Sequence, residues 1–151
     1  MTWFDLPALQ YGMQKHSLVE ERLTYSVIGA FYEVYSKLGF GFYESIYAKA
    51  LELELKLRGH KVAREVSFQI AYKDHVLGIH RVDMIIDEKL IVETKASEDF
   101  QKAALRQLHS YLRAANLRVG LLLHFGPHPR FYRFLSPTKP SPQGPSDPPI
   151  S

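Results

Sequence analysis

Between residues 66 and 95, apolar side chains recur at every second position, and two short polar segments interrupt them. This alternation is typical of half-buried strands. Strands are expected from Val66 to Tyr72, along the run VLGIHRVDMII and along LIVETK, with turns at 73–75 and 87–89. We therefore expect a three-stranded meander joined by short turns, with Asp83 in its middle strand.

Two helical segments are expected before this meander. Apolar residues recur at helical spacing from Leu23 to Leu38 and again from Ile46 to Leu57. Ser17 and Glu20 have the spacing of a capping box, so the first helix is expected to begin at Ser17 and to end at Gly39. Gly59 is expected to stop the second helix, whose first turn would contain Glu44.

After the meander the periodicity changes again. Residues 99–115 return to helical spacing, the largely apolar run VGLLLHF at 119–125 indicates a buried strand, and residues 131–135 could add an edge strand. A strand placed by a helical crossover makes the sheet mixed. The order of elements therefore predicts an α/β sandwich with a mixed β-sheet flanked by helices.

The chain has 151 residues, about the length of one ordinary domain. Residues 1–16 show no clean period and are expected to be a loose leader, whereas residues 17–135 would form the domain. Six of the nine prolines fall between Pro137 and Pro149, so residues 136–151 are expected to be a disordered tail.

The composition restricts the chemistry that is available. The chain has no cysteine, so any metal must be held by oxygen or imidazole ligands. It has no run of 18 apolar residues and no secretory leader pattern, so a soluble, cytoplasmic protein without membrane contact is expected. A net charge of +3 is too small to establish a nucleic-acid partner by itself. Six basic residues of the C-terminal half could form a basic face or could be scattered: Lys102, Arg106, Arg113, Arg118, Arg130 and Arg133.

A charged cluster is expected where two strands of the meander meet. Glu93 and Lys95 are two residues apart, so both should point to one face of their strand, and Asp83 lies on the preceding strand. If the two strands pair, two carboxylates and an ammonium converge beside apolar groups. Such a cluster costs free energy unless a cation or a proton intervenes. The alternative is a solvated pair of Glu93 and Lys95, with Asp83 capping a turn.

Three further residues could join this cluster. Gln107 and Tyr111 are four apart and share one face of the expected helix, and Glu44 lies in the first turn of an earlier helix. Each also has an ordinary interpretation: a surface amide, a core ring and an acid favoured by the helix dipole. The seven histidines have no metal-binding spacing, so hydrogen-bonded or solvated imidazoles are expected.

Four segments together resemble a known family. The string GFYESIY at 41–47, RVD at 81–83, VETKA at 92–96 and QLHSY at 107–111 are similar to the bacterial GxxExxY family of the PD-(D/E)XK nuclease superfamily. The resemblance spans about residues 20–135. Two positions depart from the family pattern: Val82 stands where a proline often precedes the aspartate, and His124 stands where asparagine is frequent.

The resemblance implies a restriction-endonuclease-like αβββαβ core and phosphodiester hydrolysis that depends on Mg²⁺ or Mn²⁺. By position, Asp83 and Glu93 resemble the metal carboxylates, Lys95 the catalytic lysine and Glu44 the acid of the first helix. Gln107 and Tyr111 resemble the Q-x-x-x-Y segment of RecB-like nucleases.

The site expected on this basis consists of Glu44, Asp83, Glu93 and the Thr94 carbonyl around an oxygen-ligated cation, with Lys95 beside it. The substrate would be nucleic acid, with DNA favoured over RNA. The competing hypothesis is a non-catalytic module that binds nucleic acid or protein on the same fold. The sequence leaves the oligomeric state open.

Overall fold

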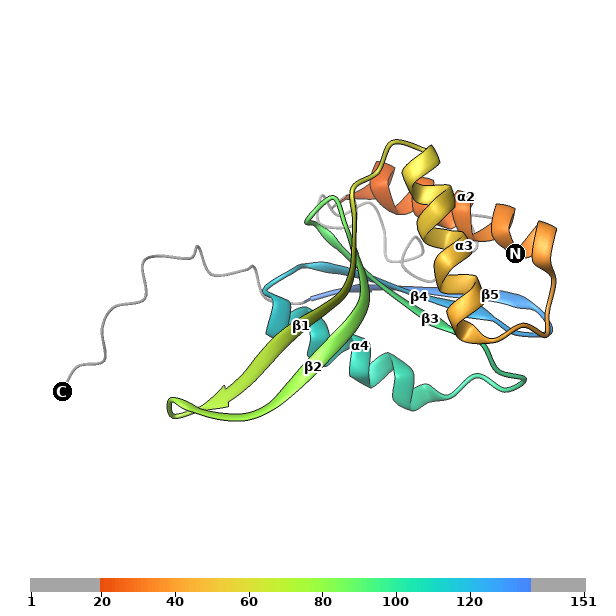
Figure 1. Cartoon of the computed structure of the whole chain (residues 1–151). Coiled ribbons are helices and arrows are strands. Elements are labelled where there is room, and N and C mark those ends of the chain that lie inside the picture. Colours follow the sequence, from red (N-terminus) through yellow and green to blue (C-terminus); the bar gives the residue numbers. More distant parts are fainter. Residues whose placement is uncertain (1–19, 137–151) are drawn as a thin grey trace, which may run out of the picture.

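The computed structural model describes residues 20–136. Figure 1 shows a twisted sheet with two helices on one face and a third helix on the other. The elements, in chain order, are α2 (Glu21–Leu38), α3 (Glu44–Leu57), β1 (Val62–Tyr72), β2 (His75–Ile86), β3 (Leu90–Lys95), α4 (Lys102–Ala115), β4 (Val119–Phe125) and β5 (Pro129–Leu135). The expected leader and most of the expected tail lie outside the described residues.

The sheet has the strand order β1-β2-β3-β4-β5. The pairs β1–β2, β2–β3 and β4–β5 are antiparallel, whereas β3 and β4 are parallel and are connected through α4. This arrangement confirms the predicted α/β fold with a mixed sheet and a helical crossover, and it is consistent with the restriction-endonuclease-like core.

The first helix begins later than the capping-box spacing suggested. It starts at Glu21, because Glu20 has a left-handed backbone conformation with φ 53° and makes no side-chain capping bond. Ser17, the other half of the expected box, lies outside the described residues. The predicted end is confirmed: Gly39 has φ 67°, and its amide donates to the Tyr35 carbonyl. A glycine adopts this conformation without the steric cost that a Cβ would add.

Two hydrophobic clusters hold the layers together. The larger cluster packs α2 and α3 against one face of the sheet around Phe31, Tyr47 and Phe125. The smaller cluster packs α4 against the other face through Leu108 and Leu112. Because helices cover it on both faces, β4 is buried along its whole length, as its largely apolar run predicted.

A close approach fixes the position of α4. A Cβ added at Gly120 of β4 would lie 2.8 Å from Leu108 and 3.3 Å from Leu112. Any larger residue there would push α4 away from the sheet. The smallest side chain in the run VGLLLHF thus marks where the crossover helix docks.

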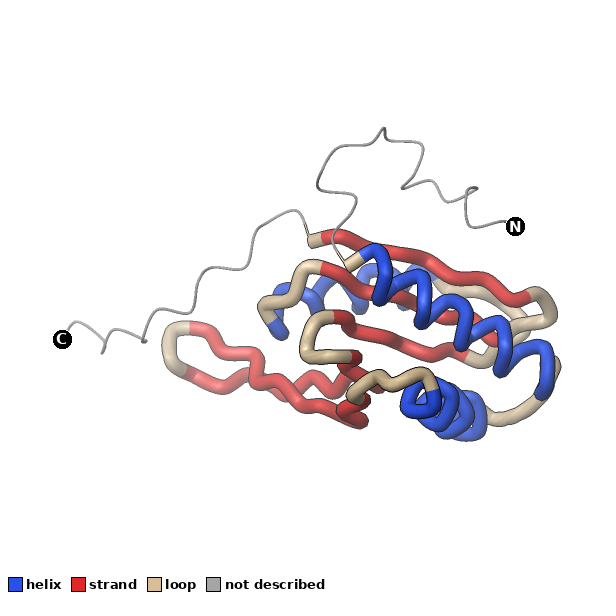
Figure 2. Tube along the Cα trace, turned by 90° about the horizontal axis from the view of Figure 1, so that it is seen from above, coloured by secondary structure: helices blue, strands red, loops and turns tan. Residues whose placement is uncertain are grey.

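The β1–β2 hairpin extends beyond the rest of the sheet, as Figure 2 shows. Its two-residue turn places Lys73 and Asp74 at positive φ, 46° and 63°. The first seven residues of β2 are exposed, and only the part from Val82 onward is inserted between neighbouring layers. Among the described residues no helix is long and apolar enough to cross a membrane.

Candidate active site

Asp83 and Glu93 lie where β2 and β3 separate. Ladder pairing between these strands runs from Ile86 and Leu90 to Met84 and Val92. At the next position the Asp83 amide donates instead to Glu93 Oε1 at 3.0 Å, and Asp83 Oδ2 accepts from the Thr94 amide at 2.8 Å and the Thr94 hydroxyl at 2.9 Å. Two carboxylates therefore replace the backbone ladder and bridge the diverging strands.

The Glu93 side chain is inside the protein. The residue is only 5% exposed, and burial, reinforced by the adjacent negative charge of Asp83, raises its pKa to about 8. The hydrogen bond from the Asp83 amide and the positive charge of Lys95 act in the opposite direction but do not compensate. The alternative interpretation of Glu93 and Lys95 as a solvated surface pair is therefore wrong. Asp83 binds Thr94 within the sheet and does not cap a turn.

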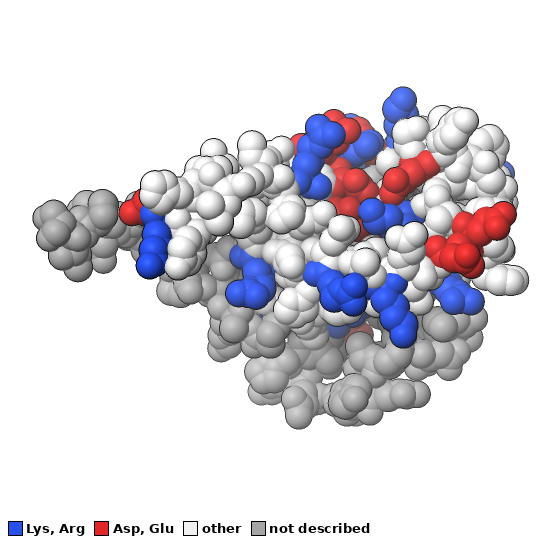
Figure 3. Space-filling view, turned by 90° about the horizontal axis from the view of Figure 1, so that it is seen from below, with Lys and Arg blue, Asp and Glu red and all other residues white. Residues whose placement is uncertain are grey.

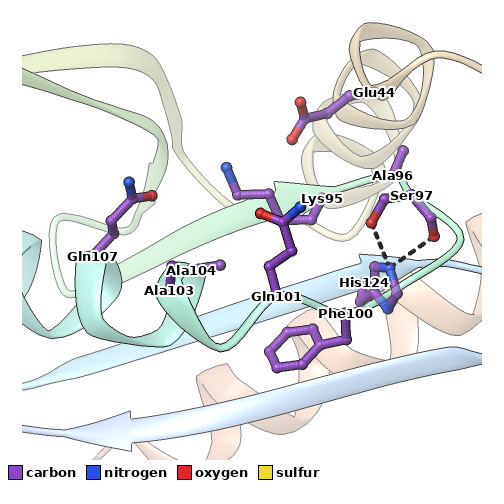
Figure 4. A pocket seen from close by; sticks show the side chains of 10 residues that line it. All are labelled: Glu44, Lys95, Ala96, Ser97, Phe100, Gln101, Ala103, Ala104, Gln107 and His124. Atoms are coloured by element: carbon purple, nitrogen blue, oxygen red, sulfur yellow. Dashed lines mark hydrogen bonds between the residues drawn. The ribbon is translucent and has the colours of Figure 1, made fainter.

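A pocket of about 180 Å³ opens beside Lys95, two residues beyond Glu93 on β3, and Asp83 and Glu93 are not among its lining residues. Glu44, Lys95 and Gln107 line it, each from a different element: the start of α3, the end of β3 and the exposed face of α4. Figure 4 shows the Lys95 side chain reaching into the space between Glu44 and Gln107. Residues far apart in sequence thus converge at the carboxyl end of β3.

Glu44 is electrostatically coupled to the other charged residues. Desolvation raises the pKa of its carboxyl group, the charge of Asp83 adds to that increase, and Lys95 opposes it. Glu44 also belongs to the first turn of α3, where the helix dipole favours a negative charge. Its carboxyl group therefore shares one local field with Asp83 and Lys95.

Tyr111 lies further along the same side of the sheet. Burial raises the pKa of its hydroxyl group, and the charges of Glu93 and Asp83 raise it further. Its ring makes an edge contact with His80, with 5.1 Å between the ring centroids. The structure thus brings Tyr111 near the two carboxylates, and it places Gln107 one helical turn earlier in the pocket wall.

The pocket is also lined by residues to which the sequence assigned no role in the site: Ser97, Phe100, Gln101 and His124. His124 is 3% exposed, and its Nε2 lies 2.9 Å from the Ser97 carbonyl and 3.1 Å from the Ser97 hydroxyl. Burial lowers the pKa of this imidazole, which favours the neutral ring. His124 neighbours Lys95 in the parallel β3–β4 pair, so it holds the loop that follows β3. In the sequence, His124 is noted only as a departure from the family pattern, without a role.

Arg64 supports the site from the other side of β2. Its Nε donates to the Asp83 carbonyl at 3.3 Å, and its Nη1 lies 3.0 Å from Glu52 of α3. Glu65, the next residue of β1, has φ 52°. Val62 packs with the α2 and α3 cluster, whereas Val66 packs with the α4 cluster, so the inward face of β1 switches across this point. Asp83 lies opposite this switch, between the ladder pairs on either side.

The donor set suits a hard divalent cation. Carboxylate and carbonyl oxygens are the ligands preferred by Mg²⁺, and a cation would offset the repulsion that raises the Glu93 pKa. Within residues 20–136 no three His, Asp or Glu side chains form a ready-made metal cluster. Asp83 and Glu93 are joined directly, whereas Glu44 approaches them from across the pocket.

The chain was compared with known proteins. A sequence profile of the PD-(D/E)XK nuclease superfamily matches residues 21–134. The crystal structure of SSO0001 is similar, with a TM-score of 0.50 and 23% sequence identity. The similarity covers 83% of this chain and 63% of that chain, and at this identity it supports the fold alone. No curated protein sequence gives a significant match.

The profile match includes α2 through β5 and therefore the whole folded unit and every residue of the candidate site. The fold has the mixed sheet and crossover helix expected of a restriction-endonuclease-like core. The chain belongs to the PD-(D/E)XK nuclease superfamily.

Proposed function

We propose that this protein is a nuclease that depends on Mg²⁺ or Mn²⁺, hydrolyses phosphodiester bonds in nucleic acid and belongs to the GxxExxY family. The observation that carries the proposal is the pairing of the half-buried Asp83 with the buried Glu93 on adjacent strands, close to a pocket lined by Lys95 and Glu44. Glu93 is only 5% exposed, and an ionised carboxylate buried beside that of Asp83 destabilises the metal-free fold. A role in binding a cation gives a reason for this loss of stability.

Asp83, Glu93 and the Thr94 carbonyl would hold the cation, and Glu44 would complete the site from the start of α3. When bound, such a cation polarises the scissile phosphate and lowers the pKa of a water molecule. Thr94 keeps Asp83 oriented, because its amide and hydroxyl both donate to Oδ2. Arg64 holds the backbone of Asp83 in place by donating a hydrogen bond to its carbonyl oxygen.

Lys95 is the chain's positive charge inside the pocket. Its ammonium would orient the attacking water and offset the charge that develops on the phosphoryl oxygens as the bond to the leaving oxygen breaks. Gln107, on the facing wall, would position Lys95 or the water. Tyr111 would pack beneath the carboxylates or contact a phosphate.

The non-catalytic binding module is the weaker hypothesis. A site that only binds phosphate gains nothing from two adjacent carboxylates, one of them buried, because they repel the phosphate. DNA is the preferred substrate in this proposal, and RNA is the alternative. The folded unit is assigned to residues 17–135, between the leader and the tail.

The test is incubation of the purified chain with labelled single-stranded, duplex and branched DNA and with the corresponding RNAs. Each is mixed with Mg²⁺, Mn²⁺ or a chelator. The proposal expects cleavage of at least one substrate with metal and none with chelator. Binding without cleavage across the whole panel would support the module instead.

A further inference from the structure

A cluster of exposed aromatic side chains lies directly before Glu44. Phe40 is 42% exposed, Phe42 is 51% exposed, Tyr43 is 85% exposed and the next apolar residue, Ile46, is 40% exposed. Single exposed apolar residues are ordinary, but four within seven positions form a patch of the kind that marks a binding surface.

The segment that presents these rings is held in place. Tyr47, which is fully buried and stacked on Phe125, donates its hydroxyl hydrogen to the Gly39 carbonyl. The same hydroxyl accepts from the Phe42 amide at 3.3 Å. Both ends of the 39–42 segment are therefore tied to one core side chain, and a preorganised surface loses little entropy when it binds a ligand.

The patch is continuous with the candidate active site. Tyr43 is bonded to Glu44, whose side chain lines the pocket, and consecutive Cα atoms are only about 3.8 Å apart. Figures 1 and 2 place the loop between α2 and α3 at the same end of the sheet as the loop that follows β3. The aromatic patch therefore begins next to the pocket wall, and Tyr43 itself is not a lining residue.

A row of basic residues lies along α4, the helix that forms the opposite wall of the pocket from Glu44. Lys102, Arg106 and Arg113 are all exposed on α4, and their spacing of four and seven puts them on one face. At about 1.5 Å per residue the row is about 16 Å long. Figure 3 shows Lys and Arg side chains following one another beside the acidic group on this face.

The row ends at a second groove, which lies between α4 and the β1–β2 hairpin and has a volume of about 490 Å³. Gln69 and His80 from the hairpin and Ser110 and Arg113 from α4 line it. Gln107 belongs to the wall of the first pocket, so the exposed face of α4 connects the two hollows.

We infer that the site takes a single-stranded segment of nucleic acid: an unpaired base next to the scissile phosphate stacks on the aromatic patch, and the phosphates beyond it follow α4. This inference rests on the proposed nuclease function and specifies its substrate class. Aromatic faces bind bases only when those bases are unpaired, and a groove with one basic row suits one backbone. Exposed acidic residues, Glu98 and Asp99, follow the pocket on the loop after β3, so phosphates are favoured on the α4 side.

The test measures binding to three labelled strands of equal length by fluorescence anisotropy, with Ca²⁺ replacing Mg²⁺ to slow cleavage. The strands are single-stranded DNA, single-stranded RNA and abasic DNA, which keeps the phosphates and lacks the bases, and a DNA duplex of the same length is measured alongside them. Tyr43→Leu removes the aromatic face and keeps apolar bulk. Tyr25→Leu, at a 59% exposed tyrosine near the start of α2 and so at the opposite end of this helix from the aromatic patch, is the matched control.

Tyr43→Leu should weaken binding to ordinary strands by about 10-fold and leave binding to abasic DNA unchanged. Tyr25→Leu should match the wild type on every strand. The double variant Arg106→Gln and Arg113→Gln should weaken binding to ordinary and abasic strands alike. The slope of log binding constant against log salt concentration should become shallower by about 0.7 for each lost phosphate contact. The comparison of DNA with RNA identifies which nucleic acid is preferred.

Equal binding of ordinary strands by Tyr43→Leu and wild type would overturn the inference, as would an equal loss on abasic DNA or tighter binding of duplex than of single strands. A wild-type dimer that Tyr43→Leu converts to a monomer, measured by light scattering, would assign the patch to self-association instead. If the wild type cleaves the substrate panel and the Tyr43 results are negative, only the substrate assignment fails. If the wild type neither binds nor cleaves nucleic acid, the proposed function fails with it.

Discussion

Replacing Glu93 with glutamine should stabilise the metal-free protein. The substitution keeps the shape and the oxygen that accepts from the Asp83 amide at 3.0 Å, but it removes a charge from a residue that is 5% exposed. A carboxyl group whose pKa rises from 4.5 to about 8 on folding makes folding less favourable once it must ionise. At pH 7.5 this difference corresponds to an upper limit of about 4 kcal/mol. We expect a measured gain of about 1–3 kcal/mol, below this limit because the protein relaxes and water reaches the charge.

The sign of the pH dependence follows from the direction of the shift. The folded state binds the Glu93 proton more tightly than the unfolded state, so the wild type loses stability as pH rises from about 4.5 to about 8. The advantage of Glu93→Gln should therefore shrink to about 1 kcal/mol at pH 5. Urea unfolding in chelator at pH 5.0 and pH 7.5 measures both values, and Glu33→Gln, on the exposed surface of α2, is the control.

Added Mg²⁺ should narrow or reverse the difference, because only the wild type has both carboxylates available to hold the cation. The reasoning would be refuted if Glu93→Gln were less stable than wild type in chelator at pH 7.5. That result would mean that the Glu93 charge is compensated within the apo protein.

Three further predictions concern the metal, a surface ion pair and the tail. Mn²⁺ or Mg²⁺ at 100 times its dissociation constant should stabilise the wild type by about 2.7 kcal/mol, and Asp83→Ala should abolish this response; identical titrations of the two proteins by thermal melting would exclude Asp83 as a ligand. Burial alone would raise the pKa of Asp87, but hydrogen bonds from the Lys61 amide and the His60 ring outweigh this effect and lower the pKa. The ionised Asp87 side chain therefore stabilises the fold near neutral pH, and this contribution disappears as pH falls through the lowered pKa. Asp87→Asn should cost about 1 kcal/mol at pH 7, a value already reduced for solvent screening, and almost nothing at pH 2, and an equal loss in urea unfolding at both values would contradict this assignment. Deleting residues 137–151 should leave the melting temperature unchanged, because both core clusters lie within residues 23–135, and a fall of several degrees would show that the deleted segment contributes to the fold.

Local periodicity was sufficient to predict most of the fold. The alternation from Val66 onward identified the three antiparallel strands β1, β2 and β3, the helical spacing before and after it identified the helices, and the run VGLLLHF identified β4 at residues 119–125. One strand is longer in the structure than predicted, because the alternation of apolar and polar residues does not continue along its first part. The β1 strand begins at Val62, four residues before the predicted start, because its inward face switches near Glu65 and the alternation is broken there.

Burial within α3 was less predictable. Leu53 and Leu57 belong to the apolar pattern of this helix but are 62% and 74% exposed, whereas Ala48 is buried. One face of α3 packs against the sheet, and the angle at which the helix docks decides which of its leucines are covered. That angle depends on α2 and β4 and is not contained in the periodicity of α3.

The acidic pair could be anticipated from strand pairing, but its support could not. A residue count placed Asp83 and Glu93 on adjacent strands, and the structure joins them through the Asp83 amide. The contributions of Arg64 and His124 depend on tertiary contacts: a hydrogen bond to the Asp83 carbonyl and hydrogen bonding to Ser97. The exposed rings at Phe42 and Tyr43 were also invisible, because aromatic residues beside a helix start are ordinarily expected to be buried.

The most direct test of the catalytic account is the variant Lys95→Met. Its single-turnover cleavage rate and its binding affinity are measured on the same nucleic-acid substrate and compared with those of the wild type. Methionine keeps most of the stem and its packing but removes the charge and the donors, and the proposed carboxylate ligands stay intact. Cleavage should fall by orders of magnitude while affinity changes little, because the lysine charge acts chiefly as charge develops in the transition state. A variant that folds, binds metal and cuts at the wild-type rate would show that the reaction takes place elsewhere on the molecule.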